Sequence, residues 1–217
     1  MTIYFISGLG ADERIFEMLK LSSSFTIRFI YWIEPIPEES LYNYSVRLSE
    51  QIEKNEEYIL IGMSLGGMVA IELNKFLSPI KTIIISSVST YREYPFLIRL
   101  IRKLKINKIT PTFLLKTPSP VAYWFFSAKT PREKFLIKSF MKNVTENYLR
   151  WSVNEVVNWK NDFRPDNLIH IHGTADRIFL FKDTFATIRI LNGGHLMIHN
   201  KAEEISNLLS KFIERDF

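Results

Sequence analysis

The stretch Tyr58-Ile59-Leu60-Ile61-Gly62-Met63-Ser64-Leu65-Gly66-Gly67-Met68 decides the fold of this chain. Its first four residues are apolar and favour a buried strand. Its glycines allow a sharp turn, and the apolar residues that follow predict a helix over 68–77. A Gly-x-Ser-x-Gly turn between a strand and a helix is typical of a nucleophile elbow, which holds a serine hydroxyl at the positive end of the helix. The alternative is a glycine-rich turn that only packs the helix on the strand.

Strands and helices alternate on both sides of this stretch. Apolar runs predict the strands, and segments with apolar residues at helical spacing lie between them. Because the runs are nearly continuous in apolar residues, we expect an α/β fold with a mostly parallel six-stranded sheet and helices on both faces. Besides 58–61, the predicted strands are 2–6, 25–32, 81–86, 168–172 and 187–191.

The alternation breaks at residue 91 and resumes near residue 165. The intervening sequence is rich in aromatic residues, is punctuated by prolines and has a helical period, with helices expected at 95–109, 131–140 and 146–159. Its apolar faces need a partner to bury against. We therefore expect residues 91–164 to be an inserted helical cap on a core formed by residues 1–90 and 165–217.

Length and composition exclude several classes of protein. A chain of 217 residues is long enough for one domain with a substantial core. The absence of cysteine excludes disulfides, thiolate metal sites and cysteine nucleophiles. No apolar run approaches the roughly 18 residues of a membrane span, and the first residues show no signal-peptide pattern. We therefore expect a cytoplasmic protein without a membrane span.

Positive charge is concentrated in the predicted cap. Residues 91–165 hold 15 Lys and Arg and 5 Asp and Glu, a net charge of +10 in a chain whose net charge is +5. The basic residues are spaced through an apolar pattern and are not clustered with glycines and aromatics, so we expect no nucleic-acid partner. A solvated helical surface is favoured, and attraction for an anionic substrate or membrane surface is the second interpretation.

Four motifs, each after a predicted strand, resemble those of the alpha/beta-hydrolase family in residue type and in chain order. The resemblance covers nearly the whole chain outside the predicted cap. It implies that the elbow strand is central in the sheet and that the cap sits over the nucleophile. The motifs are Ser7-Gly8-Leu9-Gly10, Gly62-Met63-Ser64-Leu65-Gly66, His172-Gly173-Thr174-Ala175-Asp176-Arg177 and Gly193-Gly194-His195.

The motifs assign candidate roles. Ser64 is the nucleophile, and because a serine hydroxyl needs a base within hydrogen-bond reach, His195 is the candidate base. Asp176 is the candidate acid that fixes the imidazole tautomer. The resemblance implies an oxyanion hole formed by the backbone N–H groups of Leu9 and Leu65.

A rival acid and two departures from the family pattern bear on this assignment. Asp183 lies in the same loop as Asp176 but seven residues further from the strand, and the segment after the preceding strand, Ser86–Ser89, has no carboxylate. Asp176 is therefore favoured. Ser7-Gly8 stands where many relatives have His-Gly. The link from Asp176 to Thr187 is too short for a full helix, so we expect an irregular or single-turn connection.

Other residues that could bind a metal or line a pocket are better explained by a role in packing. His170 and His172 share one face of a strand, but no third ligand is evident, so we expect a packed or hydrogen-bonded pair and no metal. The aromatic residues at 123–126 are expected to pack between cap and sheet, with pocket lining as the alternative. The predicted chemistry requires no cofactor.

Together these patterns predict a serine hydrolase that cleaves a small-molecule carboxylic ester or thioester through an acyl-enzyme on Ser64. One alternative is the same triad in non-hydrolytic chemistry, as in a lyase or a cofactor-free oxidoreductase. Another is a receptor that only binds a small molecule in the pocket. No oligomeric state is predicted.

Overall fold

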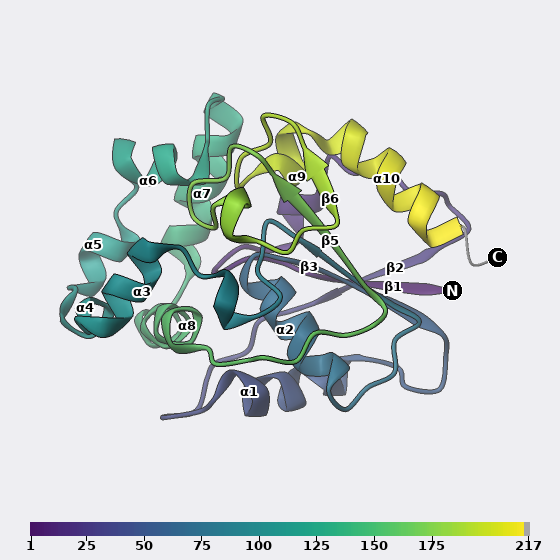
Figure 1. The fold of residues 1–217 in the computed structure, drawn as a ribbon, viewed down its shortest axis with the longest axis horizontal. Helices are drawn as coiled ribbons and strands as arrows, with labels where there is room; N and C mark the ends of the chain where they lie inside the picture. Colours follow the sequence, from purple (N-terminus) through teal and green to yellow (C-terminus); the bar gives the residue numbers. More distant parts are fainter. Residues whose placement is uncertain (215–217) are drawn as a thin grey trace.

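A single parallel sheet of six strands forms the centre of the computed structural model, which describes residues 1–214 (Figure 1). The strand order is β2-β1-β3-β4-β5-β6, and every neighbouring pair is parallel. The predicted α/β class and strand number are therefore confirmed. The strands are β1 (Thr2–Ile6), β2 (Thr26–Ile30), β3 (Tyr58–Met63), β4 (Lys81–Ile85), β5 (Leu168–Gly173) and β6 (Ile188–Ile190).

Apolar residues on both faces of the strands explain why the sheet is covered on both sides. Every residue of β1 and β3 is buried. Because side chains alternate along a strand, Tyr4 and Leu60 enter one core while Phe5 and Ile61 enter the other. The first core is closed by α1 (Leu41–Leu48) and α2 (Leu65–Asn74), and the second by the 3-10 helix η1 (Glu13–Phe16), α9 (Met197–Asn200) and α10 (Ala202–Glu214).

All regular secondary structure in residues 91–164 is helical, and this segment is called the helical insert below. In Figure 1 it lies at the end of the sheet opposite the N-terminus, which is the carboxyl end of the parallel strands. The single helix predicted over 95–109 is wrong: the chain breaks at Lys105, whose φ of 53° is left-handed. The helices are η3 (Tyr91–Glu93), α3 (Phe96–Lys103), α4 (Ile106–Ile109), α5 (Thr112–Lys116), α6 (Pro120–Phe126), α7 (Pro131–Asn143) and α8 (Glu146–Asn158).

The helical insert packs against both cores. On one side Trp151 of α8 lies 4.2 Å, centroid to centroid, from the ring of Tyr44 in α1, and its indole N–H donates to the Glu39 carbonyl. On the other side apolar residues of α7, among them Ile137 and Phe140, belong to the second core. Its position over the strand ends is therefore fixed by two separate contacts. The division of the chain into core and cap stays a prediction.

The link between β5 and β6 contains one 3-10 turn, η4 (Phe181–Asp183), and no α-helix. This confirms the expected single-turn connection after Asp176. Among the helices formed by residues 1–214, none has the length and apolar composition to cross a membrane.

Candidate active site

Ser64 occupies a tight turn between β3 and α2. Its backbone angles, φ 52° and ψ −119°, are strained for a residue with a side chain. A Cβ on Gly66 would lie 2.2 Å from the Ile6 carbonyl oxygen, and one on Gly62 would lie 2.2 Å from the Gly66 oxygen. Both glycines are therefore required because backbone segments meet there, which is the physical reason for the Gly-x-Ser-x-Gly pattern.

Ser64, His195 and Asp176 meet through consecutive hydrogen bonds. The Nε2 atom of His195 lies 3.0 Å from the Ser64 hydroxyl oxygen, and its Nδ1 atom lies 2.9 Å from Oδ2 of Asp176. Because a carboxylate only accepts hydrogen bonds, Nδ1 carries the proton. The lone pair of Nε2 is then directed at the serine hydroxyl. This is the arrangement in which the imidazole can take the serine proton.

The Asp176 carboxylate is buried and fully bonded. Its Oδ1 atom accepts from the backbone N–H groups of Ile178 and Phe179 at 2.8 and 3.1 Å. Burial raises the pKa of Asp176, but the attraction and hydrogen bond of His195, together with the Ile178 amide, outweigh that effect, so the net shift is downward. The acid therefore stays ionised and oriented. Within residues 1–214, no hydrogen bond or ion pair joins the rival Asp183 to His195, which bonds to Asp176 instead.

Two aromatic rings fix the imidazole plane. Phe126 of α6 meets the His195 ring edge-on at 5.8 Å, and Phe179 lies 6.0 Å away on a tilted plane. Of the aromatic residues at 123–126, Phe126 therefore lines the site, whereas Trp124 is 55% exposed. The structure thus divides this run between pocket and surface.

The candidate oxyanion donors lie beside Ser64. Leu65 is the first residue of α2, and neither its N–H nor that of Leu9 donates to a protein acceptor within the described chain. The loop that carries Leu9 is held in shape by the Ser7 hydroxyl, which donates to the Ala11 carbonyl at 2.6 Å. The indole N–H of Trp32 donates to the carbonyls of Gly8 and Ala11, both at 3.1 Å. Ser7-Gly8 is therefore part of a hydrogen-bonded loop.

A small apolar cavity of about 50 Å³ adjoins Ser64 and His195. Much of its wall comes from α7, whose cavity residues recur at helical spacing. The sequence interpretation missed these residues, because their apolar period indicates only that α7 is buried and not what it faces. Four other surface hollows within residues 1–214 include neither Ser64 nor His195. The apolar lining of the cavity includes Leu9, Ile15, Met63, Phe126, Ile137, Phe140, Met141 and Leu196.

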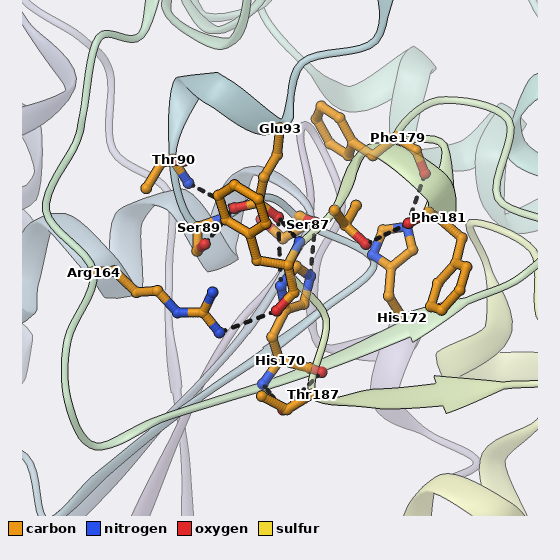
Figure 2. A network of polar contacts seen from close by, with 12 residues as sticks. Ser87, Ser89, Thr90, Glu93, Arg164, His170, His172, Phe179, Phe181 and Thr187 are labelled. Carbon is orange, nitrogen blue, oxygen red and sulfur yellow. Dashed lines mark hydrogen bonds and ion pairs between the residues drawn. The ribbon is translucent and has the colours of Figure 1, made fainter.

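A second buried polar cluster, also missed from sequence, adjoins Asp176 through His172, whose Nε2 atom lies 3.5 Å from Oδ2 of Asp176. Figure 2 shows this cluster. Its centre is Glu93, which is fully buried. One carboxylate oxygen accepts from the N–H groups of Ser89 and Thr90 and from the Ser89 hydroxyl, and the other accepts from the Phe185 N–H. Glu93 thereby ties the loop after β4 to the loop before β6. The signal available in the sequence is Thr90-Tyr91-Arg92-Glu93, which has the spacing of a helix capping box.

His170 and His172 belong to the same cluster. The Nε2–H of His170 donates to the Ser87 carbonyl at 3.0 Å, and the Ser87 hydroxyl donates to the Ser64 carbonyl at 2.7 Å. The Nε2–H of His172 donates to the Phe179 carbonyl at 2.8 Å. Burial lowers the pKa of both imidazoles, so both are neutral. The expected hydrogen-bonded pair is therefore present, and it braces the backbone on both sides of the site.

The sequence matches no protein-family model and no curated protein. Solved structures do resemble the chain. A putative lipase from Acinetobacter baumannii superposes with a TM-score of 0.71 at 13% identity, covering 98% of this chain and 83% of that one. An esterase from Exiguobacterium antarcticum gives 0.69 at 16% identity, with 99% and 92% covered. A bromoperoxidase from Bacillus anthracis gives 0.71 at 13% identity, with 98% and 91% covered. At such identities the likeness establishes the fold alone.

Proposed function

We propose that this chain, which has the alpha/beta-hydrolase fold, is a serine hydrolase that cleaves a carboxylic ester or thioester through an acyl-enzyme on Ser64. One observation carries the proposal. The Ser64 hydroxyl, the His195 imidazole and the Asp176 carboxylate form a continuous hydrogen-bonded chain of 3.0 and 2.9 Å, with the imidazole in the base-competent tautomer.

Acylation follows from this geometry. His195 accepts the hydroxyl proton at Nε2 while the Ser64 oxygen attacks the acyl carbon, and Asp176 stabilises the imidazolium that forms. The amides of Leu9 and Leu65 donate to the tetrahedral oxyanion. Their hydrogen-bonding capacity is not used elsewhere in the described chain, so no internal bond has to break for them to do so.

Collapse of the tetrahedral intermediate breaks the bond to the leaving group. The His195 imidazolium gives its proton to the departing alkoxide or thiolate, so an alcohol or thiol leaves and an acyl ester remains on Ser64. Water then attacks the acyl carbon and gives a proton to Nε2. A second collapse returns that proton to the Ser64 oxygen and releases the carboxylic acid. Every proton in the cycle passes through one imidazole nitrogen, and no cofactor enters it.

The cavity supports a short acyl group. Its volume of about 50 Å³ is roughly a third of the cavity that accommodates benzene in an engineered protein core, so the acyl chain has on the order of two to four carbons. Its wall is apolar, and it is closed by α6 and α7 of the helical insert, which we propose acts as the cap. The esterases and the lipase among the structural neighbours are consistent with ester substrates.

A second candidate is non-hydrolytic chemistry at the same triad. One structural neighbour is described as a bromoperoxidase, so the fold is not restricted to proteins described as hydrolases. Product analysis separates the two candidates, because hydrolysis releases one carboxylic acid for each ester consumed.

The test combines labelling with turnover. The native chain should react with a fluorophosphonate probe at Ser64, located by peptide mass spectrometry, and should hydrolyse nitrophenyl esters with a maximum between acetyl and butyryl. Short-chain acyl-CoA substrates test the thioester branch. Ser64→Ala should abolish labelling and turnover without changing the melting temperature. Wild-type turnover by Ser64→Ala would overturn the mechanism. Labelling without turnover of any ester would favour the non-hydrolytic candidate, and the absence of both labelling and turnover would favour a receptor.

A further inference from the structure

Helices α3 to α6 carry apolar side chains that the rest of the chain does not cover. The four most exposed large apolar residues within residues 1–214 all lie here: Phe96, Ile109, Phe113 and Val121, at 77, 76, 65 and 63% exposure. In α4 and α6 no residue is buried, and in α5 only Thr112 is. Their contribution to the two cores is small: Ile98 of α3 is buried in the first core, and Tyr123 and Phe126 of α6 pack, partly buried, against the second. Short helices of this kind need packing for stability.

These side chains share one end of the molecule. In Figure 1, α3, α4 and α5 lie together at the end opposite the N-terminus, with α6 beside them. Each of α3, α4 and α5 contacts α8 on its inner side. Their outward sides, with the outward side of α6, form what we call the basic apolar face, residues 96–124. Such a patch on a folded chain marks an interaction site.

The charge of this face is of one sign. Residues 96–124 contain six Lys and Arg and no Asp or Glu. None of these six cations forms an ion pair within the part of the chain that the structure describes. The face therefore offers apolar groups and unneutralised positive charge together. The six are Arg99, Arg102, Lys103, Lys105, Lys108 and Lys116.

We propose that the basic apolar face docks on an anionic lipid membrane. Apolar side chains insert to the depth of the acyl boundary while the flanking cations meet lipid phosphates, a combination that suits an anionic membrane interface. Nucleic acid fits less well. Phe96, Phe113 and Trp124 offer rings that stack on bases, but Ile109, Leu114 and Val121 offer neither stacking nor hydrogen bonds to bases. A second copy of this chain fits less well, because the six cations of one face would repel the six cations of the other.

Docking by this face also has a geometric consequence for the site. Helix α6 exposes Val121 and Trp124 at the surface and places Phe126 in the cavity beside His195. The Arg177 guanidinium lies 4.4 Å from the Trp124 ring centroid and donates to the Trp124 carbonyl, which joins α6 to the loop of Asp176. The membrane would therefore lie next to the helix that closes the cavity. Binding itself does not depend on the chemistry proposed for Ser64.

Vesicle co-sedimentation of the full chain tests the proposal, with Ser64→Ala present so that no lipid is cleaved. We expect binding to phosphatidylcholine vesicles that contain about 30% phosphatidylglycerol, and little binding to phosphatidylcholine alone. Each lysine near such a surface contributes about fivefold, so Lys103→Glu with Lys108→Glu should weaken binding by at least about 25-fold. Raising the salt from about 0.1 to 0.5 M should also weaken it.

Controls separate docking from general charge and from misfolding. Lys54→Glu with Lys211→Glu makes the same charge change at two exposed positions outside the helical insert, and should keep most of the binding. Ile109→Ser with Phe113→Ser should abolish binding at an unchanged melting temperature, because neither side chain is packed. Equal binding to neutral vesicles, or none to anionic vesicles, would overturn the proposal. The proposal would also be overturned by an oligomer in gel filtration that the Ile109→Ser, Phe113→Ser variant no longer forms. RNA binding tighter than vesicle binding would overturn it as well.

Discussion

At the scale of single residues, the proposed chemistry depends on which nitrogen of His195 carries a proton. Asp176 decides this by accepting from Nδ1 at 2.9 Å. In Asp176→Asn the amide can donate to Nδ1 and favour the wrong tautomer. We expect kcat for a nitrophenyl ester to fall by about 10³ to 10⁴. Asp183→Asn is the matched control and should leave kcat unchanged. The reverse pattern would identify Asp183 as the acid.

The elbow glycines make an independent residue-scale prediction about folding. A Cβ on Gly66 meets the Ile6 and Ser7 carbonyl oxygens at 2.2 and 2.3 Å, and neither backbone can move without disturbing β1. Gly66→Ala should therefore lower the free energy of unfolding by about 3 kcal/mol or more, measured by urea denaturation. A Cβ on Gly8 makes only ordinary contacts of 3.5 Å or more, so Gly8→Ala should retain wild-type stability. An equal loss of stability in Gly66→Ala and Gly8→Ala would contradict the close approach of backbone atoms to Gly66.

At the scale of elements, the proposed function predicts that α7 limits the length of the acyl group, because Ile137, Phe140 and Met141 line the cavity. Met141 lies in the cavity wall and is 8% exposed. Met141→Ala removes the atoms beyond Cβ, so the preferred nitrophenyl ester should lengthen by about two carbons, at a cost to stability of about 2–5 kcal/mol. Lys138→Ala changes an exposed position of the same helix and should leave the chain-length profile unaltered. An unchanged profile for Met141→Ala would place the acyl group elsewhere.

At the scale of the whole molecule, buried histidines make stability depend on pH. His170 and His172 are neutral in the fold because burial lowers the pKa of each below its usual value of 6.5. Below pH 6.5 the unfolded chain binds protons that the folded chain does not, so stability falls as pH falls from 6.5 toward the lowered values. Each histidine contributes a slope of up to about 1.4 kcal/mol per pH unit.

Urea unfolding between about pH 7.5 and 5 measures this slope. His170→Gln keeps a donor near the Ser87 carbonyl but cannot titrate, so its curve should be shallower than that of the native chain. Asp176 does not contribute in this window. Its pKa is lowered below the usual 3.8, so the stability it adds is lost only as pH falls through that lower value. An identical slope in the native and His170→Gln chains would show that His170 titrates normally.

The sequence by itself determined the strands, the turn and the residues from which the candidate site is built. Buried strands, a turn that needs glycine at positions 62 and 66, and candidate residues just after three of the strands are local properties, visible in apolar periodicity and residue size. Because parallel strands end at the same edge, local order alone predicted that Ser64, Asp176 and His195 would lie together. The order of the motifs could not predict the hydrogen bonds of 3.0 and 2.9 Å that join them.

Only the tertiary structure decided which surfaces those elements face. Met141 lines the cavity, Glu93 joins two loops, and Phe96 is left in solvent, although all three lie in helices of the same insert. The chain also breaks at Lys105, between α3 and α4, and both of these helices contact α8. Such outcomes depend on pairs of residues far apart in the chain. Helical period indicates that a face is buried or exposed, but the partner that buries it is fixed only when the whole chain packs.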